Sequence, residues 1–269
     1  MAVKQCRHGL FAYNLNDAFI GRSLDEYGEW SEEELNIILQ VLKPGDIALD
    51  IGANIGTHTV PQAKKVGKTG AVIAFEPQRV TFQNLCANVA LNALTNVRCI
   101  NAGVGDANGK LTIPFLDPEA HNNFGGLNIE GHAQGESIDI VKVDDYTLPR
   151  CNLIKIDVEG MEAKVLAGAS KTIAAHRPVL FVENNNEERS AAILKRLDAL
   201  GYAAWWHIAG EFNPKNFFGR SESALGGGYL EANVLCFPRE AKVNLSGLWP
   251  VEGPDDSRVK AIRRHGLGI

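Results

Sequence analysis

The stretch Asp50-Ile51-Gly52-Ala53-Asn54-Ile55-Gly56 is the strongest indication of the fold in this chain. It ends a short apolar run, residues 47–51, that suits a strand buried within a parallel sheet. We expect a helix to begin near Thr57. Small residues in the turn allow the backbone to approach a ligand closely, and the first N–H groups of the helix can bind it. The pattern predicts a strand–turn–helix unit with a ligand site at the turn.

Strand-like and helix-like stretches alternate along the rest of the chain. Before the turn, residues 31–42 should form a helix that begins with a capping box of Ser31 and Glu34. Such alternation predicts an α/β fold, with right-handed crossovers and helices on both faces of the sheet. The expected strands are 47–51, 71–75, 97–101, 110–115, 137–143, 152–156, 179–182, 203–207 and 232–237, and the later helices are 78–94, 161–175 and 187–200.

The chain divides into three parts in our interpretation. Residues 1–45 form an N-terminal helical or cap segment, residues 46–238 the main domain, and residues 239–269 a C-terminal extension. A chain of 269 residues can bury one full core, and no linker demands a second one. The segments 117–135 and 208–230 are long for loops in a compact domain, which favours a binding role for them.

Composition narrows the class of protein. The formal net charge is −5, so the basic surface typical of nucleic-acid binding is not indicated. The five cysteines are scattered without a C-x-x-C pair, which argues against a disulfide framework or a zinc site. No apolar run approaches the roughly 20 residues that cross a bilayer, and the N-terminus lacks the apolar region of a signal peptide. We expect a cytoplasmic protein with neither a nucleic-acid nor a membrane partner.

An acidic residue follows the second expected strand, in Phe75-Glu76-Pro77. It lies 20 residues after Gly56, where a carboxylate can accept both hydrogen bonds of a ribose diol. The site could bind NAD(P) or S-adenosylmethionine (SAM). A dinucleotide site requires G-x-G-x-x-G, whereas here the spacing is G-x-x-x-G with Asn54 inside it. Asp50 would repel a pyrophosphate and suits the cationic end of SAM, so SAM is favoured.

At this point the chain resembles the FkbM family of methyltransferases, over about residues 25–238. The resemblance implies that residues 46–238 are a Rossmann-like class I methyltransferase domain. Its mostly parallel sheet would have seven strands, the last of them antiparallel, with helices on both faces. It also implies SAM as the methyl donor, and usually a hydroxyl on a sugar, polyketide or other small metabolite as the acceptor. The resembling stretches are 27–31, 44–46, 49–56, 74–77, 103–106, 122–126, 154–162, 165–169 and 212–217.

The resemblance also implies roles for individual residues. Residues of the glycine turn would surround the methionine part of SAM, and Glu76 would bind the ribose. Gly103, Val104 and Asp106 would border the adenine. Asp157 would face both the amino end of SAM and the acceptor. The implied cofactor contacts are Asp50, Gly52, Ala53, Asn54, Gly56, Thr57, Glu76, Pro77, Gly103, Val104, Asp106 and Asp157.

Methyl transfer to a hydroxyl needs an aligned acceptor oxygen and a group that takes the proton. Asp157 is our first choice for this base, followed by Glu159 and His58. The alternatives are structural. Asp157 could only cap the turn that follows it, and Glu159 could stabilise the N-terminus of the next helix. His58 could position the substrate.

A divalent cation is a further hypothesis for activating the hydroxyl. Asp157 ends the fourth strand of the sheet, and Glu183 and Asn184 follow the fifth. Oxygen ligands of this kind suit Mg²⁺, which acidifies a bound hydroxyl. Without a metal, Glu183 and Asn184 would line the acceptor cleft.

Other functions stay open at this point. An N-methyltransferase would need no strong base, and a SAM-binding module without catalysis would have a filled acceptor pocket. An NAD(P)-dependent oxidoreductase is disfavoured by Asp50 and Asn54. The expected partner is a small hydroxylated acceptor, whose pocket we place in the segments 117–135 and 208–230, with Phe217 and Phe218. The sequence leaves the oligomeric state open, with a homodimer as one alternative.

Overall fold

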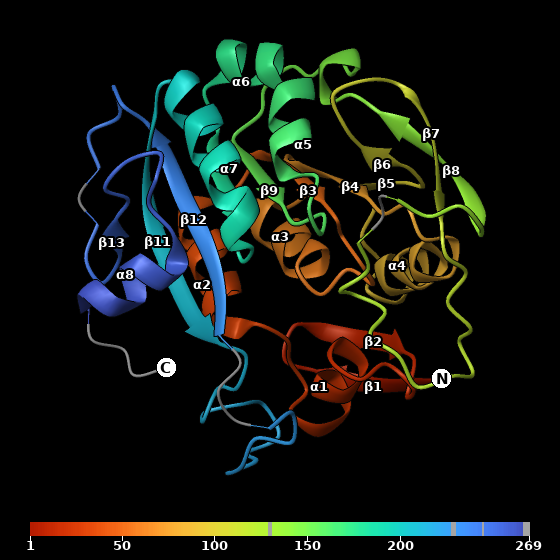
Figure 1. The fold of residues 1–269 in the computed structure, drawn as a ribbon. Coiled ribbons are helices and arrows are strands. Elements are labelled where there is room, and N and C mark those ends of the chain that lie inside the picture. Colours follow the sequence, from red (N-terminus) through yellow and green to blue (C-terminus); the bar gives the residue numbers. More distant parts are fainter. Residues whose placement is uncertain (129–130, 227–229, 244, 266–269) are drawn as a thin grey trace.

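The computed structural model describes residues 1–128, 131–226, 230–243 and 245–265. Its largest element is a twisted sheet that runs through the centre of the molecule (Figure 1). Its strands are β3 (Ile47–Ile51), β4 (Ala71–Phe75), β5 (Val97–Ile100), β9 (Leu153–Ile156), β10 (Val179–Glu183), β11 (Tyr202–Gly210), β12 (Leu230–Pro238) and β13 (Trp249–Pro250).

The order of these strands is β13-β11-β12-β10-β9-β3-β4-β5. Neighbours from β10 to β5 are parallel, whereas β12 is antiparallel to both β10 and β11. The predicted sheet of seven mostly parallel strands, with the last antiparallel, is confirmed. The C-terminal part adds β13 as an eighth strand at the edge of β11.

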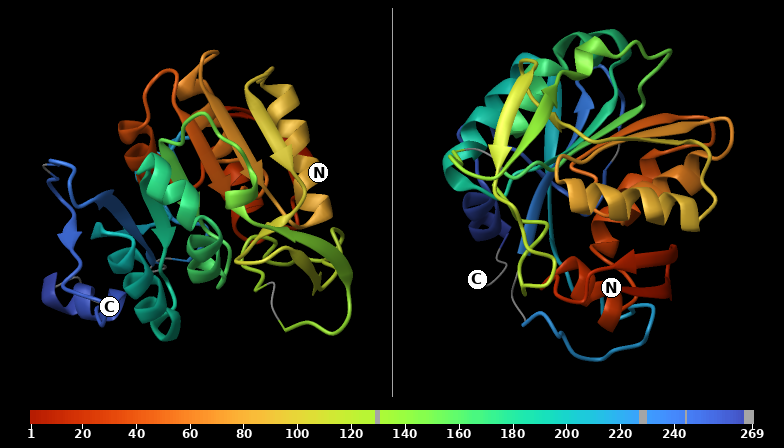
Figure 2. Two further views of the ribbon diagram at one scale, coloured as in Figure 1. Left: turned by 90° about the horizontal axis from the view of Figure 1, so that it is seen from above. Right: turned by 90° about the vertical axis from the view of Figure 1, so that its right-hand side faces the viewer.

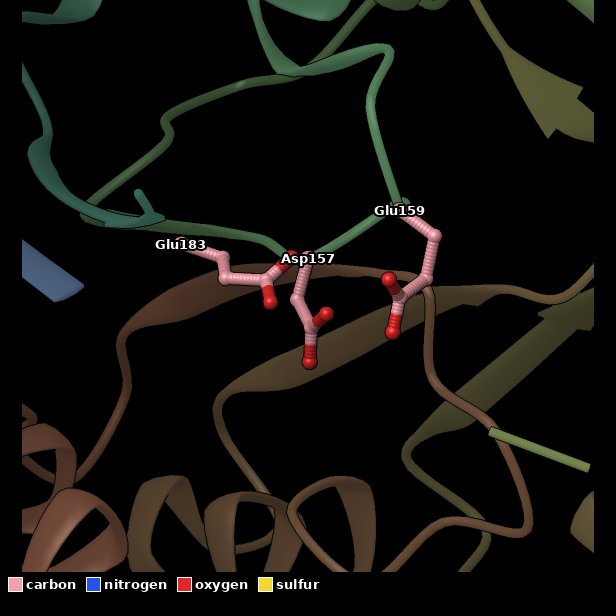
Figure 3. Close-up of side chains that lie close together, drawn as sticks. All are labelled: Asp157, Glu159 and Glu183. Atoms are coloured by element: carbon pink, nitrogen blue, oxygen red, sulfur yellow. The ribbon is translucent and has the colours of Figure 1, made fainter. Parts of the chain in front are cut away.

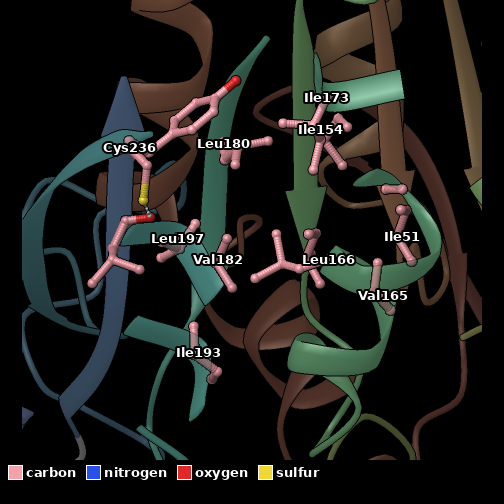
Figure 4. Packing of buried hydrophobic residues seen from close by; sticks show 14 of the residues in the cluster. Ile51, Ile154, Val165, Leu166, Ile173, Leu180, Val182, Ile193, Leu197 and Cys236 are labelled. Atoms are coloured by element: carbon pink, nitrogen blue, oxygen red, sulfur yellow. Dashed lines mark hydrogen bonds between the residues drawn. The ribbon is translucent and has the colours of Figure 1, made fainter. Parts of the chain in front are cut away.

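Helices cover both faces of the sheet, as predicted (Figure 2). One face packs against α5, α6, α7 and α8, and the other against α2, α3 and α4. Strand β10 shows why both faces are apolar. Leu180 and Val182 pack in the cluster on the first face, where Figure 4 labels them, and Phe181 packs in the cluster on the second. The helices are α2 (Glu32–Val41), α3 (Thr59–Val66), α4 (Arg79–Leu91), α5 (Glu162–Gly168), α6 (Ser170–His176), α7 (Glu187–Ala199) and α8 (Arg258–His265).

No helix among the described residues combines the length and the apolar character that crossing a bilayer requires.

One expected helix is divided in two. Residues 161–175 form α5 and α6, which meet at Ala169. The carboxylate of Asp144 accepts the backbone N–H groups of Lys171 and Thr172, at 3.0 and 2.8 Å. Asp144 therefore caps the start of a second helix, and it does so from a distant part of the chain.

The expected capping box of α2 is wrong. Ser31 has a φ of 44°, and its hydroxyl donates to Glu231 at 3.1 Å instead of accepting from the helix. Glu34 is buried and accepts a hydrogen bond from Asn233. Both side chains turn toward β12, because tertiary partners there replace the local backbone partners that a capping box would use.

The N-terminal segment contains a β-hairpin that the sequence analysis did not predict. Strands β1 (Ala2–Cys6) and β2 (Gly9–Tyr13) form it, and the helix α1 (Ile20–Glu26) follows. The hairpin is held to α4 by Asn88, whose side-chain amide exchanges hydrogen bonds with the backbone of Ala12. The divisions of the chain after residues 45 and 238 stay predictions.

The strands expected over residues 110–115 and 137–143 exist, but they lie outside the main sheet. They are β7 (Gly109–Ile113) and β8 (Glu136–Val141), and with β6 (Gly103–Val104) they form a separate sheet in the order β6-β8-β7. This small sheet lies beyond β5, above α4 in Figure 1.

Candidate active site

A cavity of about 230 Å³ lies at the carboxyl ends of β3, β4, β9 and β10, where open α/β sheets bind ligands. Most of the predicted site residues meet there. Those that line it are Gly52, Ala53, Asn54, Thr57, His58, Glu76, Pro77, Gly103, Val104, Asp157, Glu159 and Glu183. Four predicted residues are not among its described lining residues, namely Asp50, Gly56, Asp106 and Asn184.

The glycine turn places the predicted cofactor side of the cavity against the end of β9. Gly52 has a φ of 81°, and a Cβ atom there would lie 1.7 Å from the carbonyl oxygen of Asp157. Only glycine permits this approach. Asn54 also has a positive φ, of 50°, which asparagine tolerates better than most residues. The two motifs singled out in the sequence are therefore in direct contact.

Glu76 lines the cavity with a carboxylate that the backbone already holds. Its oxygens accept the N–H groups of Asn54 at 2.9 Å and Gln78 at 2.8 Å. Burial raises the pKa of Glu76 to about 7, while these two hydrogen bonds act in the opposite direction. The arrangement fixes the carboxylate at the end of β4 and leaves it lone pairs for a diol. Its role toward ribose stays a prediction.

Asp50 lies beneath the cavity and is fully buried. The hydroxyl of Thr59 donates to its Oδ2 at 2.6 Å, and Nζ of Lys155 lies 3.6 Å from its Oδ1. The cation beside Asp50 in this structure is therefore a lysine of the chain. The predicted contact of Asp50 with the amino end of SAM stays a prediction.

Lys155 is a site residue that the sequence analysis missed. Its ammonium donates to Asp157 Oδ2 at 3.0 Å and to the carbonyl oxygen of Gly52 at 3.3 Å. Burial lowers the pKa of Lys155, but Asp157 and Asp50 outweigh it, so the net shift is upward and the side chain stays charged. A lysine within the otherwise apolar strand β9 was the signal that could have revealed it.

Three carboxyl groups meet at the ends of β9 and β10. One oxygen each of Asp157, Glu159 and Glu183 lies within 4.8 Å of the others, and Figure 3 shows the carboxyl groups facing a common space. Burial raises the pKa of Glu159 to about 8, and it raises that of Glu183 well above the ordinary value; nearby carboxylates add to both. Such a group can take up a proton or hold a divalent cation. In the metal hypothesis, Glu159 takes the place expected of Asn184.

His58 lies in the same cavity. Its side chain is 6% exposed, and its Nε2 makes no hydrogen bond among the described residues. The nearest acid is Glu34, at 3.8 Å from Nε2 to Oε2. Burial, with a further contribution from Lys155, holds the pKa of His58 well below its ordinary value. The imidazole is therefore neutral near pH 7.

Five further residues line the cavity although the sequence predicts no site role for them. They come from the N-terminal segment and from the ends of β11 and β12, and they are Trp30, Glu34, Glu211, Glu231 and Asn233. The sequence pattern places Glu34 in a helix cap, Trp30 belongs to the resembling stretch 27–31 without an implied role, and the other three carry no motif. Only the folded chain brings them to the cavity.

The two long segments predicted to form the acceptor pocket line the cavity to different extents. Segment 117–135 lines the cavity through Asn123, Gly125, Gly126 and Leu127, and segment 208–230 through Glu211. Phe217 and Phe218 are half-exposed and lie against Gly28 instead. Residues 129–130 and 227–229, which include two glycines of the run at 226–228, lie outside the described residues.

Comparisons with known proteins agree with this architecture. A solved precorrin-6y C5,15-methyltransferase from Geobacter metallireducens GS-15 has a similar fold, with a TM-score of 0.51 at 15% identity. The match covers 80% of this chain and 94% of that one. At this identity the likeness concerns the fold alone.

Two curated relatives are similar in sequence. One is the hexuronic acid methyltransferase AglP of Haloferax volcanii, 30% identical over 155 residues, which are 57% of this chain and 62% of the relative. The other is the methyltransferase sdnD of Sordaria araneosa, 29% identical over 157 residues, which are 46% of this chain and 60% of the relative. The chain thus spans about three fifths of the relatives' length.

The sequence model described as the methyltransferase FkbM domain matches residues 50–203. This range begins at the first residue of the glycine turn, contains the whole Asp157 motif, and ends in β11. It makes up more than half of the chain. The protein belongs to the FkbM family of methyltransferases.

Proposed function

We propose that this chain transfers the methyl group of SAM to a hydroxyl of a small, sugar-like metabolite. The observation that carries the proposal is the single cavity that joins the glycine turn and Glu76 to the carboxyl group of Asp157. The glycine turn and Glu76 suit a nucleoside, and the carboxyl group of Asp157 can accept the proton that the hydroxyl must lose. The similar hexuronic acid methyltransferase supports a sugar as the acceptor class.

Bound SAM would supply an activated methyl group on a sulfonium sulfur. The chain's part is to hold the acceptor hydroxyl in line with that group and to accept its proton. The carboxylate of Asp157 would accept the proton that the acceptor hydroxyl loses when its oxygen takes the methyl group. Lys155 holds this carboxylate in place through Oδ2, at 3.0 Å. Most of the rate enhancement would come from this alignment.

A divalent cation is the second way to activate the hydroxyl, and one observation favours it. The oxygens of Asp157, Glu159 and Glu183 approach within 4.8 Å of one another, which is close enough to share one ion. The ammonium of Lys155 already lies beside Asp157, so an ion would bind next to a positive charge. This makes proton acceptance by the carboxylate our first choice.

The test is methyl transfer from radiolabelled SAM to a panel of hydroxylated sugars, with the variant Asp157→Asn. We expect kcat to fall about 10²- to 10⁴-fold, the range typical of a lost general base. SAM should still bind in calorimetry, which shows that the variant is folded. Asp139→Asn, an exposed carboxylate on β8, is the control for the substitution.

Other outcomes separate the alternatives. Loss of activity in EDTA that Mg²⁺ restores would favour the metal, and unchanged activity in EDTA would reject it. A methyl group found on nitrogen by mass spectrometry would indicate the N-methyltransferase. SAM binding without transfer to any acceptor would contradict the proposal and leave a cofactor-binding module.

A further inference from the structure

A second group of acids lines the cavity from elements that carry no expected cofactor contact. Glu34 comes from α2, Glu211 follows β11, and Glu231 lies in β12; we call them the acid trio. Glu34 and Glu211 are buried and Glu231 is partly buried, and two of the three have hydrogen-bond donors of the chain. Ser31 donates to Glu231, and Asn233 donates to Glu34.

Two polar atoms in this part of the cavity have no hydrogen-bond partner among the described residues. One is Oε2 of Glu211, whose residue is 8% exposed. The other is Nε2 of His58, which belongs to a different element and whose residue is 6% exposed. Both residues line the cavity. Buried polar atoms are nearly always paired, so these two indicate a ligand that supplies the missing partner.

No charged lysine or arginine in the described part of the chain forms an ion pair with the acid trio. Glu211 and Glu231 have no ion pair within 4.0 Å there, and the only basic group that close to Glu34 is His58, at 3.8 Å. His58 is neutral near pH 7, because burial holds its pKa far below the ordinary value. Lys155 is already bonded to Asp157 and lies near Asp50. Burial raises the pKa of all three acids, and Glu34 lies within hydrogen-bond reach of Glu231, so without a ligand the trio holds protons. A positive charge from outside would take the place of those protons.

We propose that the acid trio binds a protonated amino group of the acceptor, which would therefore be an amine-bearing polyol such as an amino sugar. An ammonium has a positive charge and three donors, enough to reach several carboxylates at once. Trp30 lines the same cavity, and an indole ring attracts a cation that lies over its face. The inference rests on the proposed methyl transfer and makes its acceptor class more specific.

Two consequences follow for the reaction. An amine that the trio keeps protonated has no free lone pair, so the methyl group goes to a hydroxyl and the amine serves for recognition. A carboxylate on the acceptor would be repelled by the same acids. The chain would thus differ in acceptor charge from the hexuronic acid methyltransferase that it resembles.

The experiment uses the purified chain, radiolabelled SAM and a small-molecule extract of the organism that encodes it, separated by ion exchange into cationic, neutral and anionic fractions. Glucosamine, glucose and glucuronic acid serve as a defined set that differs in charge. We expect label in the cationic fraction and, by mass spectrometry, on oxygen. Label on oxygen but mainly in the neutral or anionic fraction would overturn the inference and leave the proposed O-methyl transfer standing. Label on nitrogen would overturn both, because the proposed function places the methyl group on a hydroxyl. Label in no fraction, with SAM still bound, would contradict the proposed function itself.

Variants test whether the acid trio causes the preference. Glu211→Gln and Glu231→Gln keep the shape of the side chain and remove its charge. Each should lower kcat/KM for the labelled cationic acceptor about 10- to 100-fold, the range for one charged hydrogen bond, with the KM for SAM unchanged. Glu222→Gln, an exposed residue of the same segment, should have no effect. Binding of S-adenosylhomocysteine by calorimetry shows that each variant is folded. Unchanged kcat/KM in both folded trio variants would overturn the inference.

Discussion

Lys155 lies between two aspartates that depend on it in different ways. Asp50 is fully buried, so the ammonium compensates a charge that water cannot reach. Asp157 is partly exposed and projects into the cavity, so Lys155 there fixes a side chain that would take part in the chemistry. One residue thus links the stability of β3 to the geometry of the site.

Replacing this lysine should cost more stability than any surface lysine does. We expect Lys155→Met to lower the free energy of unfolding by about 3–5 kcal/mol, because it leaves Asp50 buried without its cation. Urea denaturation followed by circular dichroism measures the change. Lys110→Met, which breaks an exposed pair with Asp139, should stay within about 1 kcal/mol. A loss below about 1 kcal/mol for Lys155→Met would mean that Thr59 alone satisfies Asp50.

The sequence predicted the site residues whose role depends on local chain geometry. The glycine turn and Glu76 each follow a strand directly, and strand ends in a parallel sheet meet at one edge. Glu211 and Glu231 could not be found in this way, because their place at the cavity depends on how β11 and β12 return to the sheet. Lys155 was detectable in principle, as a charge in a buried strand.

At the scale of single elements, the bounds of strands agree with the apolar runs in the sequence, whereas the ends of helices depend on tertiary contacts. Strands β3 and β4 have the predicted bounds, residues 47–51 and 71–75. The break between α5 and α6 was not predicted, because the cap comes from Asp144, which lies far away in the sequence. A local pattern cannot reveal a cap that another segment provides.

Helices α2 and α7 offer a matched test of capping, because Ser31 precedes the first and Asn186 the second. Asn186 accepts the N–H groups of Glu188 and Arg189 and caps α7, so Asn186→Ala should cost about 1 kcal/mol of stability. Ser31 caps nothing in α2, but it is buried and its hydroxyl donates to Glu231. Ser31→Ala should therefore also cost about 1 kcal/mol, and this cost should be smaller in a Glu231→Ala background, whereas the cost of Asn186→Ala should be the same in both backgrounds. Thermal and urea unfolding of the variants gives the comparison. A cost of Ser31→Ala that does not depend on Glu231 would contradict the structure at Ser31.

At the scale of the whole molecule, the main sheet was predictable and the N-terminal hairpin was not. Alternating apolar runs specify parallel strands with helices between them, and this alternation recurs along most of the chain. The hairpin β1–β2 lies outside this alternation of strands and helices. It is fixed by contacts with α4, through Asn88, that arise only in the folded chain.

The acid-rich cavity should give the whole protein an unusual dependence of stability on pH. Burial raises the pKa of Glu76 to about 7 and those of Glu159 and Glu211 to about 8, from an ordinary value of 4.5. Between these values the folded chain binds more protons than the unfolded chain, so stability falls as pH rises from about 5 to 8.

Scanning fluorimetry or calorimetry across this range should show Tm decreasing with pH. Glu211→Gln should flatten the decrease, because an amide cannot lose a proton, whereas Asp139→Asn should leave it unchanged. A Tm that rises from pH 5 to 8 would show that these carboxyl groups are ionised in the folded chain. The apo protein is the form to use, since an ammonium ligand would change the titration.

The C-terminal strand β13 has a consequence that concerns self-association more than chemistry. It pairs with β11 through two residues, Trp249 and Pro250, and the following turn is held by the bond from the Trp206 indole to Asp256, at 3.0 Å. Every described residue that lines the cavity precedes Pro238. A chain that ends after Pro238 would keep the side chains that line the cavity. It would, however, expose the edge of the nine-residue strand β11. An exposed strand edge is a template on which other copies can add strands and aggregate. The C-terminal tail therefore protects the edge of the sheet from pairing with other copies of the chain.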